Sequence, residues 1–343
     1  MDAPDGNLMQ PSLYELLHCL VITYNRAENL RTTLSRLAVS PFRETRITVL
    51  DNASTDGTPE VTAEFASRFP HYEVIRHKYN IGGPCNLLRA FELSQGRYTW
   101  VLGDDDLLNP VDISDVHDVM AAESADVISL SLFRRPEAMS GKFFTYQESI
   151  REGIFFFGCF SQITNTVFKT SLLDSRLMHQ GYRLAHTLFT QFPLLIKLAV
   201  ENRRMYCARE AVITRSRYDG PTWSAADLWV GWAEVCSLIP DKEIREHSLQ
   251  DYFANSKSLC LVLPKVILQS HALENRQTDL FMRSARFLSP AARMTTVLTC
   301  WVCLLPPGFI RAVMKIFYRL AGRPYDFVPA KSGPAVELDI MRQ

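Results

Sequence analysis

The sequence has little that would point to nucleic acid or to a structural metal cage. The formal net charge of its 343 residues is zero, and it has no long basic run that could neutralise a phosphate backbone. The eight cysteines are scattered, and the single CxxC pair, Cys300 and Cys303, has no second Cys or His pair at zinc-site spacing. We therefore expect no nucleic-acid partner, and buried thiols in a reducing compartment.

Signals for export and for membrane spans are also scarce. The first residues lack a basic stretch followed by a long apolar run, so no signal peptide is predicted. No stretch reaches the roughly 18–20 continuous apolar residues that a spanning helix needs. The longest apolar region lies near the C-terminus and is interrupted by Pro306 and Pro307. These features predict a cytoplasmic protein.

The first 135 residues alternate between strand-like and helix-like patterns. Strands are predicted at 18–23, 46–50, 72–76, 97–102 and 125–133, and helices at 29–39, 58–69, 82–94 and 111–122. Strands that alternate with helices of 10–15 residues indicate βαβ units and a mostly parallel sheet, hence an α/β fold. In such sheets ligands bind beyond the carboxyl ends of the strands.

The rest of the chain is less regular and then mainly helical. A strand is predicted at 163–168, a helix kinked at Pro193 over 185–200, and a return to the sheet within 205–214. Helices are predicted at 227–238, 243–262 and 280–288. Gly220 and Pro221 mark the best candidate boundary.

Three consecutive carboxylates, Asp104, Asp105 and Asp106, directly follow the strand at 97–102. Such a cluster at the end of a buried strand is costly unless a cation neutralises it. Mg²⁺ suits this demand, because it takes one or two protein carboxylates together with phosphate oxygens. The alternative is a solvated acidic turn that caps the next helix.

Polar clusters follow two other strands and open a third helix. Residues 23–28 could meet a ring and a ribose, or could form a polar loop in which Asn25 caps the helix. In residues 51–57, Asp51 could accept hydrogen bonds from an imide N–H or a ribose hydroxyl, or could simply make an Asx turn. Residues 80–86 place the Gly82–Gly83 pair at a helix start, which exposes free N–H groups or makes a plain turn.

The order of these motifs resembles that of family 2 glycosyltransferases. Along roughly residues 16–135 the chain reads strand–TYNRxENL, strand–DNASTDGT, NxGGxxN–helix and strand–GDDD–xxxP. The resemblance implies a GT-A fold, which is Rossmann-like with a mostly parallel sheet and flanking helices, plus a mainly helical C-terminal region. It implies a nucleotide-sugar-binding half at 1–135, an acceptor-binding half at 136–220, and the helical region at 221–343. The GDDD spelling and residues 161–168 are similar to abequosyltransferase-like enzymes of surface-polysaccharide synthesis.

The resemblance also implies roles for individual residues. Residues that would border the base, the ribose and the donor sugar are Thr23, Tyr24, Glu28, Asp51, Asn80, Gly82, Asn86 and Asp104. Asp104 and Asp106 would be the DXD pair that holds Mn²⁺ or Mg²⁺, with Asp105 close by as a catalytic candidate. Gly103 stands where the commoner pattern LDxDD has its first acid. Which of the three aspartates touches the metal and which the sugar therefore stays open.

The implied reaction is metal-dependent transfer of a hexosyl or deoxyhexosyl group from a nucleoside-diphosphate sugar. The acceptor would be a glycan or a polyprenyl-linked saccharide in O-antigen or capsule synthesis. The metal would stabilise the leaving diphosphate, and an inverting enzyme, which we expect, needs a base for the acceptor hydroxyl. The window in which relatives place that acid, 181–191, contains no Asp or Glu. His186 is the predicted base, with a helix-packing histidine as the alternative and Asp174 as a second candidate.

Two further segments and two rival functions remain. Residues 215–224 carry two arginines and two aromatic rings, which suit a mobile lid or a linker. Residues 294–323 are apolar, aromatic and basic, and predict either a helix in a membrane interface, on the inner face of the plasma membrane, or a core helix. One rival is a catalytically degenerate carbohydrate-binding relative. The other is a nucleotidyltransferase, which would normally show a Gly-rich, basic phosphate loop that residues 16–30 lack.

Overall fold

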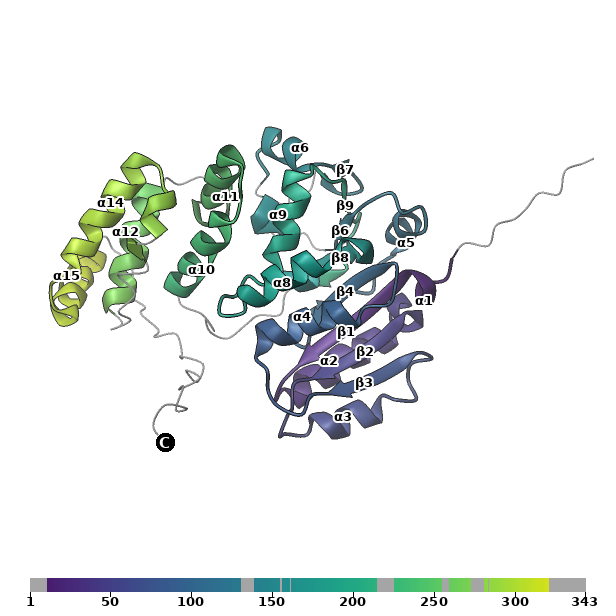
Figure 1. Ribbon diagram of the computed structural model, residues 1–343. Helices are drawn as coiled ribbons and strands as arrows, with labels where there is room; N and C mark the ends of the chain where they lie inside the picture. Colours follow the sequence, from purple (N-terminus) through teal and green to yellow (C-terminus); the bar gives the residue numbers. More distant parts are fainter. Residues whose placement is uncertain are drawn as a thin grey trace, which may run out of the picture. The chain divides into compact units, whose positions relative to one another are not determined.

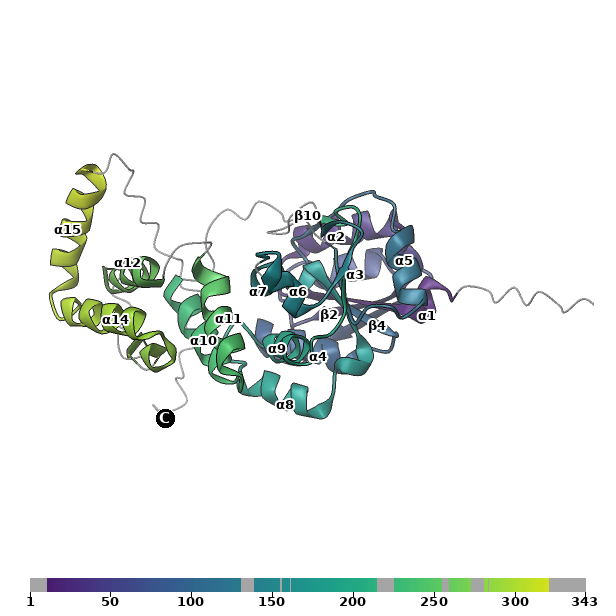
Figure 2. The same cartoon turned by 90° about the horizontal axis from the view of Figure 1, so that it is seen from above.

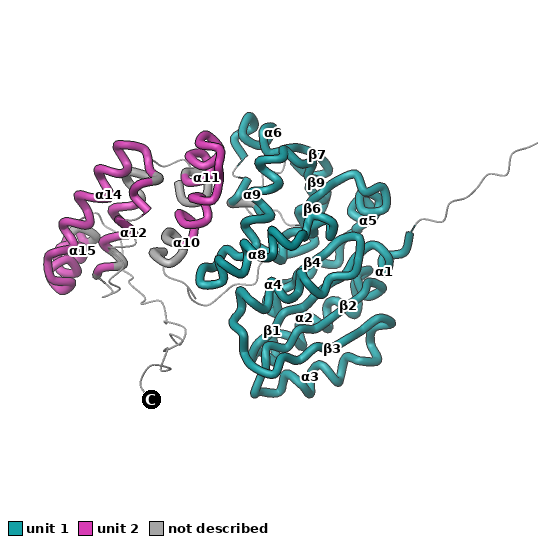
Figure 3. The backbone as a smooth tube through the Cα atoms, viewed as in Figure 1, with its two compact units in different colours: residues 1–216 teal, residues 217–343 magenta. Residues whose placement is uncertain are grey.

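The computed structural model describes residues 11–130, 139–154, 156–160, 162–214, 225–254, 259–272, 281–282 and 284–320. The chain divides into two compact units, residues 1–216 and 217–343 (Figure 3). The division falls next to the predicted boundary at Gly220–Pro221. That boundary and the segment 215–224 lie outside the described residues.

Unit 1 is built on an eight-stranded sheet in the order β3-β2-β1-β4-β8-β6-β9-β7 (Figure 1). Its first four strands are parallel, and they are β1 (Leu17–Thr23), β2 (Arg46–Asp51), β3 (Tyr72–Arg76) and β4 (Tyr98–Gly103). The register places Thr23 opposite Asp51 and Ile22 opposite Gly103. The polar segments after β1, β2 and β4 therefore start side by side at one edge of the sheet.

The other half of the sheet is mixed. β8 (Thr166–Lys169) runs antiparallel to both β4 and β6 (Val127–Ser129), β9 (Met205–Cys207) runs parallel to β6, and β7 (Phe143–Phe144) runs antiparallel to β9. β5 (Leu107–Leu108) and β10 (Ile213–Thr214) form a separate two-stranded sheet. The predicted α/β class is confirmed, and the predicted halves 1–135 and 136–220 share one sheet.

The helices of the first half follow the strands as the apolar spacing predicts. They are α2 (Ala27–Ala38), α3 (Thr58–Glu64), α4 (Gly83–Leu93) and α5 (Ser114–Ala121), and a short α1 (Leu13–Leu16) precedes β1. α2 buries Leu30, Leu34 and Leu37 at helical spacing. β1 buries nearly every side chain, as a central parallel strand covered on both faces does.

The predicted kinked helix at 185–200 is wrong. The structure has α8 (Ser175–Arg183), a turn, and then α9 (Phe192–Val200). Pro193 lies in the first turn of α9, where its missing N–H would have no partner within the helix. The proline therefore starts a helix instead of bending one. Similarly, the predicted strand at 163–168 begins as a 3₁₀ turn, Ile163–Asn165, before β8.

Unit 2 is helical in every described segment longer than three residues. Its helices are α10 (Ala225–Ser237), α11 (Lys242–Ala254), α12 (Leu259–Ala272), α14 (Pro290–Val302) and α15 (Pro307–Leu320). The predicted helix at 243–262 corresponds to α11 and the start of α12, and residues 255–258 between them lie outside the described residues. The predicted helix at 280–288 is α-helical at the described residues 281, 282 and 284, and is followed by the 3₁₀ turn Ala285–Phe287. α12 packs against both α14 and α15.

Of the described helices, none alone is long and apolar enough to cross a membrane. The pair Pro290–Val302 and Pro307–Ile316 meets that test together, but its two helices are bent by 114° at the break between them (Figure 2).

Candidate active site

The acidic turn after β4 is held by two side chains from the β1–α2 loop. Asp104 is buried, with 4% of its surface exposed. Its Oδ2 accepts a hydrogen bond from Thr23 Oγ1 at 2.7 Å, and its Oδ1 accepts one from Arg26 Nη1 at 3.2 Å. The same Nη1 donates to Asp105 Oδ2 at 2.9 Å. Arg26 therefore bridges two of the three carboxylates.

Burial dominates the electrostatics of Asp104. Removal from water raises the pKa of this carboxyl to about 6, although the Thr23 hydroxyl and the Arg26 guanidinium both act to lower it. The raised pKa means that neither partner fully compensates the buried negative charge. A further cation at this position would be stabilising.

Gly103 makes room for the other two carboxylates. A Cβ at this position would lie 3.2 Å from Asp105 Oδ1 and 3.4 Å from Asp106 Oδ2. The Gly103 N–H donates to Thr164 Oγ1 at 3.1 Å, and this hydrogen bond joins the end of β4 to the 3₁₀ turn that precedes β8. A larger residue here would crowd both aspartates, so the departure from the LDxDD pattern has a steric consequence on the acidic turn itself.

The donor set fits a divalent metal whose coordination is shared with a ligand. Among the described residues, no group of three or more His, Cys, Asp or Glu side chains is arranged to hold a metal ion. Asp104 and Asp106 nevertheless supply hard carboxylate oxygens, and Mg²⁺ is commonly bound through one or two carboxylates plus phosphate oxygens and water. Of these carboxylates, the buried and incompletely neutralised Asp104 would be stabilised most by a bound cation.

The β1–α2 and β2–α3 loops are hydrogen-bonded to each other. The Asn25 N–H donates to Ser54 Oγ at 2.9 Å, and Asn25 Oδ1 accepts from the Thr55 N–H at 2.7 Å. Asp56 Oδ2 accepts from the Ala27 N–H at 3.0 Å, at the start of α2. The alternative that Asn25 caps α2 is therefore wrong: Asn25 has φ of 52° and is used between the loops, while Asp56 satisfies the helix N-terminus.

Asp51 is engaged by its own loop and by β3. It is buried at the end of β2, its Oδ1 accepts from the Ser54 N–H at 2.8 Å, and its Oδ2 lies 3.4 Å from Arg76 Nε. These contacts agree with the alternative in which Asp51 stabilises the turn that follows β2. Contact between Asp51 and a nucleotide base stays a prediction.

Asn80, Gly82 and Asn86 link the β3–α4 segment to β2. Asn80 Oδ1 accepts from Asn52 Nδ2 and from the Gly82 N–H, both at 2.8 Å. Gly82 has φ of 84°, a conformation that favours glycine, directly before α4. Asn86 is buried, with Oδ1 2.9 Å from His77 Nε2 and Nδ2 donating to the main-chain oxygen of Leu50. Like Asp51, Asn80 and Asn86 make hydrogen bonds that hold the loops together at the carboxyl edge of the sheet.

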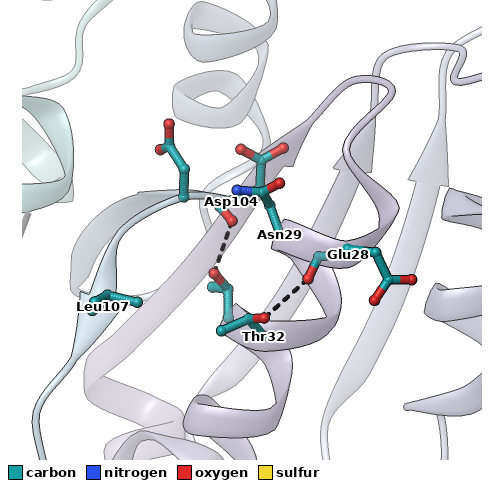
Figure 4. A pocket seen from close by; sticks show the side chains of 7 residues that line it. Glu28, Asn29, Thr32, Asp104 and Leu107 are labelled. Carbon is teal, nitrogen blue, oxygen red and sulfur yellow. Dashed lines mark hydrogen bonds between the residues drawn. The ribbon is translucent and has the colours of Figure 1, made fainter. Parts of the chain in front are cut away.

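A pocket of about 230 Å³ opens between the acidic turn and α2. It is lined by Glu28, Asn29, Thr32, Thr33, Asp104, Asp105 and Leu107. Figure 4 shows its lining, with the Thr32 hydroxyl donating to the main-chain oxygen of Glu28. Glu28 therefore lines a pocket beside the acidic turn, and Tyr24 is exposed at the carboxyl end of β1. Contact of either residue with a base or ribose stays a prediction.

The two candidate bases have different surroundings. His186 is exposed in the turn between α8 and α9, and its catalytic role stays a prediction. Asp174 caps α8 by accepting from the Leu177 N–H at 2.8 Å, and it pairs with Lys197 Nζ at 2.8 Å. The Lys197 and Leu177 contacts hold the pKa of Asp174 below its usual range. Asp174 therefore serves the fold of α8.

Arg26, Asn52 and Thr164 also contribute to this site, although no role is predicted for them from the sequence. A signal for Arg26 was available, because one basic residue stood in a loop predicted to meet three acids. Asn52 and Thr164 gave no such signal, since their contacts join segments 28 and 61 residues apart in the chain.

A family model described as "Glycosyl transferase family 2" matches residues 19–181. Residues 19–181 belong to glycosyl transferase family 2. The match covers β1 through α8, and so includes the loops and the acidic turn described above.

Two curated relatives carry descriptive names. The chain is 34% identical over 97 residues to abequosyltransferase RfbV of Salmonella typhimurium, which covers 27% of this chain and 29% of RfbV. It is 22% identical over 312 residues to the GalNAc(5)-diNAcBac-PP-undecaprenol beta-1,3-glucosyltransferase of Campylobacter jejuni, covering 88% of this chain and 97% of that enzyme. The alignments to RfbV and to an uncharacterised Escherichia coli glycosyltransferase, YibD, span less than a third of either relative.

Solved structures share the fold. TarS residues 1–349 from S. aureus, crystallised with UDP, aligns with a TM-score of 0.58 and 16% identity over 92% of this chain and 95% of TarS 1–349. The same protein with UDP-GlcNAc aligns with a TM-score of 0.57. This likeness establishes the GT-A fold with a helical C-terminal region.

Proposed function

We propose that this protein is a metal-dependent glycosyltransferase that moves a sugar from a nucleoside-diphosphate sugar to a glycan or lipid-linked saccharide. The observation that carries the proposal is the acidic turn of a family 2 domain, in which Thr23, Arg26 and the aspartates meet at the carboxyl edge of the sheet. Because the matched family is one of glycosyl transferases, we prefer sugar transfer to nucleotidyl transfer.

The donor would lie across the carboxyl ends of β1, β2 and β4. Tyr24 and Glu28 would border the base and ribose, and Asp51 would contact the base. Asn80, Gly82 and Asn86 would shape the donor side of the cleft. The UDP and UDP-GlcNAc complexes of TarS, which has the same fold, support a nucleotide-sugar donor of this type.

A divalent cation, Mn²⁺ or Mg²⁺, would be held by Asp104 and Asp106. When bound, such an ion supplies Lewis-acid stabilisation of a leaving diphosphate. The protein's own groups would act around it. Thr23 orients Asp104, Arg26 bridges Asp104 and Asp105, and Gly103 leaves room for the carboxylates of Asp105 and Asp106. His186 would accept the proton of the acceptor hydroxyl in an inverting, hexosyl or deoxyhexosyl transfer.

The acceptor and location belong to the same proposal. Two relatives are named for transferring sugars, and one of them is named for an undecaprenol-linked substrate. We infer a role in surface-polysaccharide synthesis, O-antigen or capsule, in the cytoplasm and peripherally on the inner face of the plasma membrane.

The test is a thermal-shift screen of UDP-, GDP-, CDP- and dTDP-sugars with and without Mn²⁺ or Mg²⁺. We expect one nucleotide to raise the melting temperature, and to do so only with metal, since a ligand that binds the native state stabilises it by mass action. Asp106→Ala should abolish this shift and leave the ligand-free melting temperature unchanged. Wild-type behaviour of this variant would refute the metal assignment.

A catalytically degenerate carbohydrate-binding relative is the second candidate, and the absence of an acid from 181–191 favours it. Metal-dependent release of nucleoside diphosphate separates the two. Binding of the donor without any release, in the presence of lipid-linked and soluble glycan acceptors, would favour the degenerate relative.

A further inference from the structure

The helices α14 and α15 and the turn between them carry a set of exposed apolar side chains, which we call the apolar stripe. Its members are Met294, Leu298, Trp301, Val302, Leu304, Leu305, Phe309, Val313, Ile316 and Leu320. They are ten of the 21 large hydrophobic residues that are exposed among the described part of the chain. Trp301 is 66% exposed, Leu304 81% and Leu320 83%. Exposed apolar patches of this extent in soluble proteins mark interaction surfaces.

Both helices expose a face of large apolar side chains, in contrast to ordinary surface helices. The buried face of α14 carries the small residues Ala292, Thr296, Thr299 and Cys300, and its exposed face carries the large apolar ones. On α15 the exposed residues Phe309, Val313, Ile316 and Leu320 follow the spacing of a single helical face, while Ile310 and Met314 are buried. The stripe is therefore a second apolar face, in addition to the one that packs inside unit 2.

The charge of this segment has one sign. Residues 290–320 contain no Asp or Glu, and their four charged residues are Arg293, Arg311, Lys315 and Arg319. The last three recur every four residues along α15 and are exposed, so they line one side of the helix, which we call the basic flank. This side borders the apolar stripe at Arg319 and turns away from it at Arg311. An apolar face combined with basic residues on the polar side of the same helix is the arrangement of helices that lie in the interface of anionic membranes.

Length and angle decide how the pair could meet a bilayer. α14 has 13 residues and α15 has 14, whereas a spanning helix needs about 20. The bend of 114° between them prevents one straight span. Both helices can instead lie along the surface, with Leu304 and Leu305 at the corner.

We propose that the apolar stripe and its basic flank form a docking surface for the anionic face of a lipid bilayer. This inference deepens the proposed function, because it would bring a glycosyltransferase to an acceptor held in the membrane. A second copy of the chain fits the surface less well, since a symmetric dimer through the stripe would bring together two segments that carry only positive charge.

The experiment is flotation of the full-length protein with vesicles of phosphatidylcholine alone and of equimolar phosphatidylcholine and phosphatidylglycerol. We expect binding to the anionic vesicles that weakens with salt. Leu298→Gln combined with Phe309→Gln should weaken it on the order of a hundredfold, about tenfold for each side chain withdrawn from the interface. Both side chains are exposed, so the substitutions leave the core of unit 2 intact.

Matched controls separate the stripe from general hydrophobicity and charge. Leu238→Gln changes an exposed leucine of the same unit outside the stripe, and should bind as wild type. Lys315→Gln combined with Arg319→Gln should weaken binding about fivefold for each charge, on anionic vesicles only. Trp301 fluorescence should shift to the blue on anionic vesicles, and the shift should be lost in Trp301→Phe while flotation persists.

Several outcomes would overturn the proposal. They are no flotation with either vesicle, equal flotation of the Leu298→Gln/Phe309→Gln protein, or a lipid-free dimer that this double variant converts to a monomer. Donor binding, measured by thermal shift in the same variants, depends on unit 1 and tests the proposed function separately. Absence of flotation of the wild-type protein with intact donor binding would contradict only the proposed docking surface. Absence of donor binding in a protein that floats would contradict only the proposed function.

Discussion

At the scale of single residues, the ion pair between Arg26 and Asp104 joins the β1–α2 loop to the acidic turn after β4. They lie 78 positions apart in the chain, and their contact exists because β1 and β4 are neighbours in the sheet. Asp104 is buried and Arg26 is about one-third exposed. Burial of the Asp104 charge therefore costs free energy, while solvent screens its attraction to the partly exposed Arg26.

Arg26→Ala should destabilise the protein by about 1–2 kcal/mol at neutral pH, because the Asp104 carboxylate loses its nearest cation. The effect should shrink at about pH 5, where Asp104, with a pKa of about 6, is mostly protonated. Urea unfolding at both pH values measures the difference. Arg31→Ala is the control, since Arg31 is about equally exposed and pairs with Glu64 and Glu28 instead of Asp104. An equal pH dependence in both variants would contradict the expectation.

Asp104→Asn should make the metal-free protein more stable at neutral pH. A raised carboxyl pKa means that the folded state holds the proton more tightly than the unfolded chain between about pH 4 and about pH 6. The Asp104 contribution to the free energy of unfolding therefore falls as pH rises through that window, by about 3 kcal/mol at most. Thermal unfolding in chelator across this range should show the slope in wild type relative to Asp104→Asn, and parallel curves would rule the shift out.

His186→Ala should lower the transfer rate by about 10²–10⁴, the usual contribution of a general base, and leave donor affinity unchanged. Initial rates and donor titration on the same preparation measure the two quantities. His179→Ala is the matched control, since His179 is also exposed and lies on the adjacent α8. An unchanged rate in His186→Ala would make His186 a surface residue and place the base elsewhere.

At the scale of elements, a single side chain, Asp174, connects the helices α8 and α9. Asp174 caps α8 and also holds Lys197 of α9. Gly181 of α8 is packed so closely that an added Cβ would lie 2.6 Å from a methyl group of Leu88 on α4. α8 therefore joins the predicted donor and acceptor halves through packing.

Asp174→Ala should cost about 1 kcal/mol of stability, the typical value of an N-cap. Asp174→Asn should keep the cap, because an asparagine oxygen accepts the same hydrogen bond, and lose only the partly exposed ion pair with Lys197. Chemical unfolding measures both variants. If Asp174→Asn kept its stability and lost transfer activity, Asp174 would be the base after all.

At the scale of the whole molecule, two compact units carry two different surfaces. The acidic turn and the polar loops lie in unit 1, and the apolar stripe lies in unit 2. Each unit has its own buried core. A chain of this kind is expected to depart from two-state unfolding.

Differential scanning calorimetry should accordingly resolve two transitions that respond to different ligands. The nucleotide-sugar donor with metal should raise the transition of unit 1, because it binds only that unit in the native state. Anionic vesicles should move the other transition. A single transition that both ligands shift together would show that the units unfold as one.

Much of the fold and the site location followed from the sequence alone. Apolar runs such as 18–22 and 46–50 defined buried parallel strands, and the polar residues directly after them had to meet at one edge. These are local patterns, so the motif order also predicted the family match. Helix starts do not follow from the same patterns. Pro193 lies in an apolar run, and a proline there has the same sequence signature whether it bends a helix or begins one.

The sequence by itself determined which carboxylates stand at the end of β4, and that a glycine precedes them. Only the tertiary structure decided that Arg26 bridges two of them, that Asp56 instead of Asn25 satisfies the start of α2, and that α14 and α15 turn large apolar side chains outward. The physical reason is the same in each case. Hydrogen bonds, ion pairs and burial depend on which distant segments become neighbours, and periodicity along the chain records only the neighbours within one element.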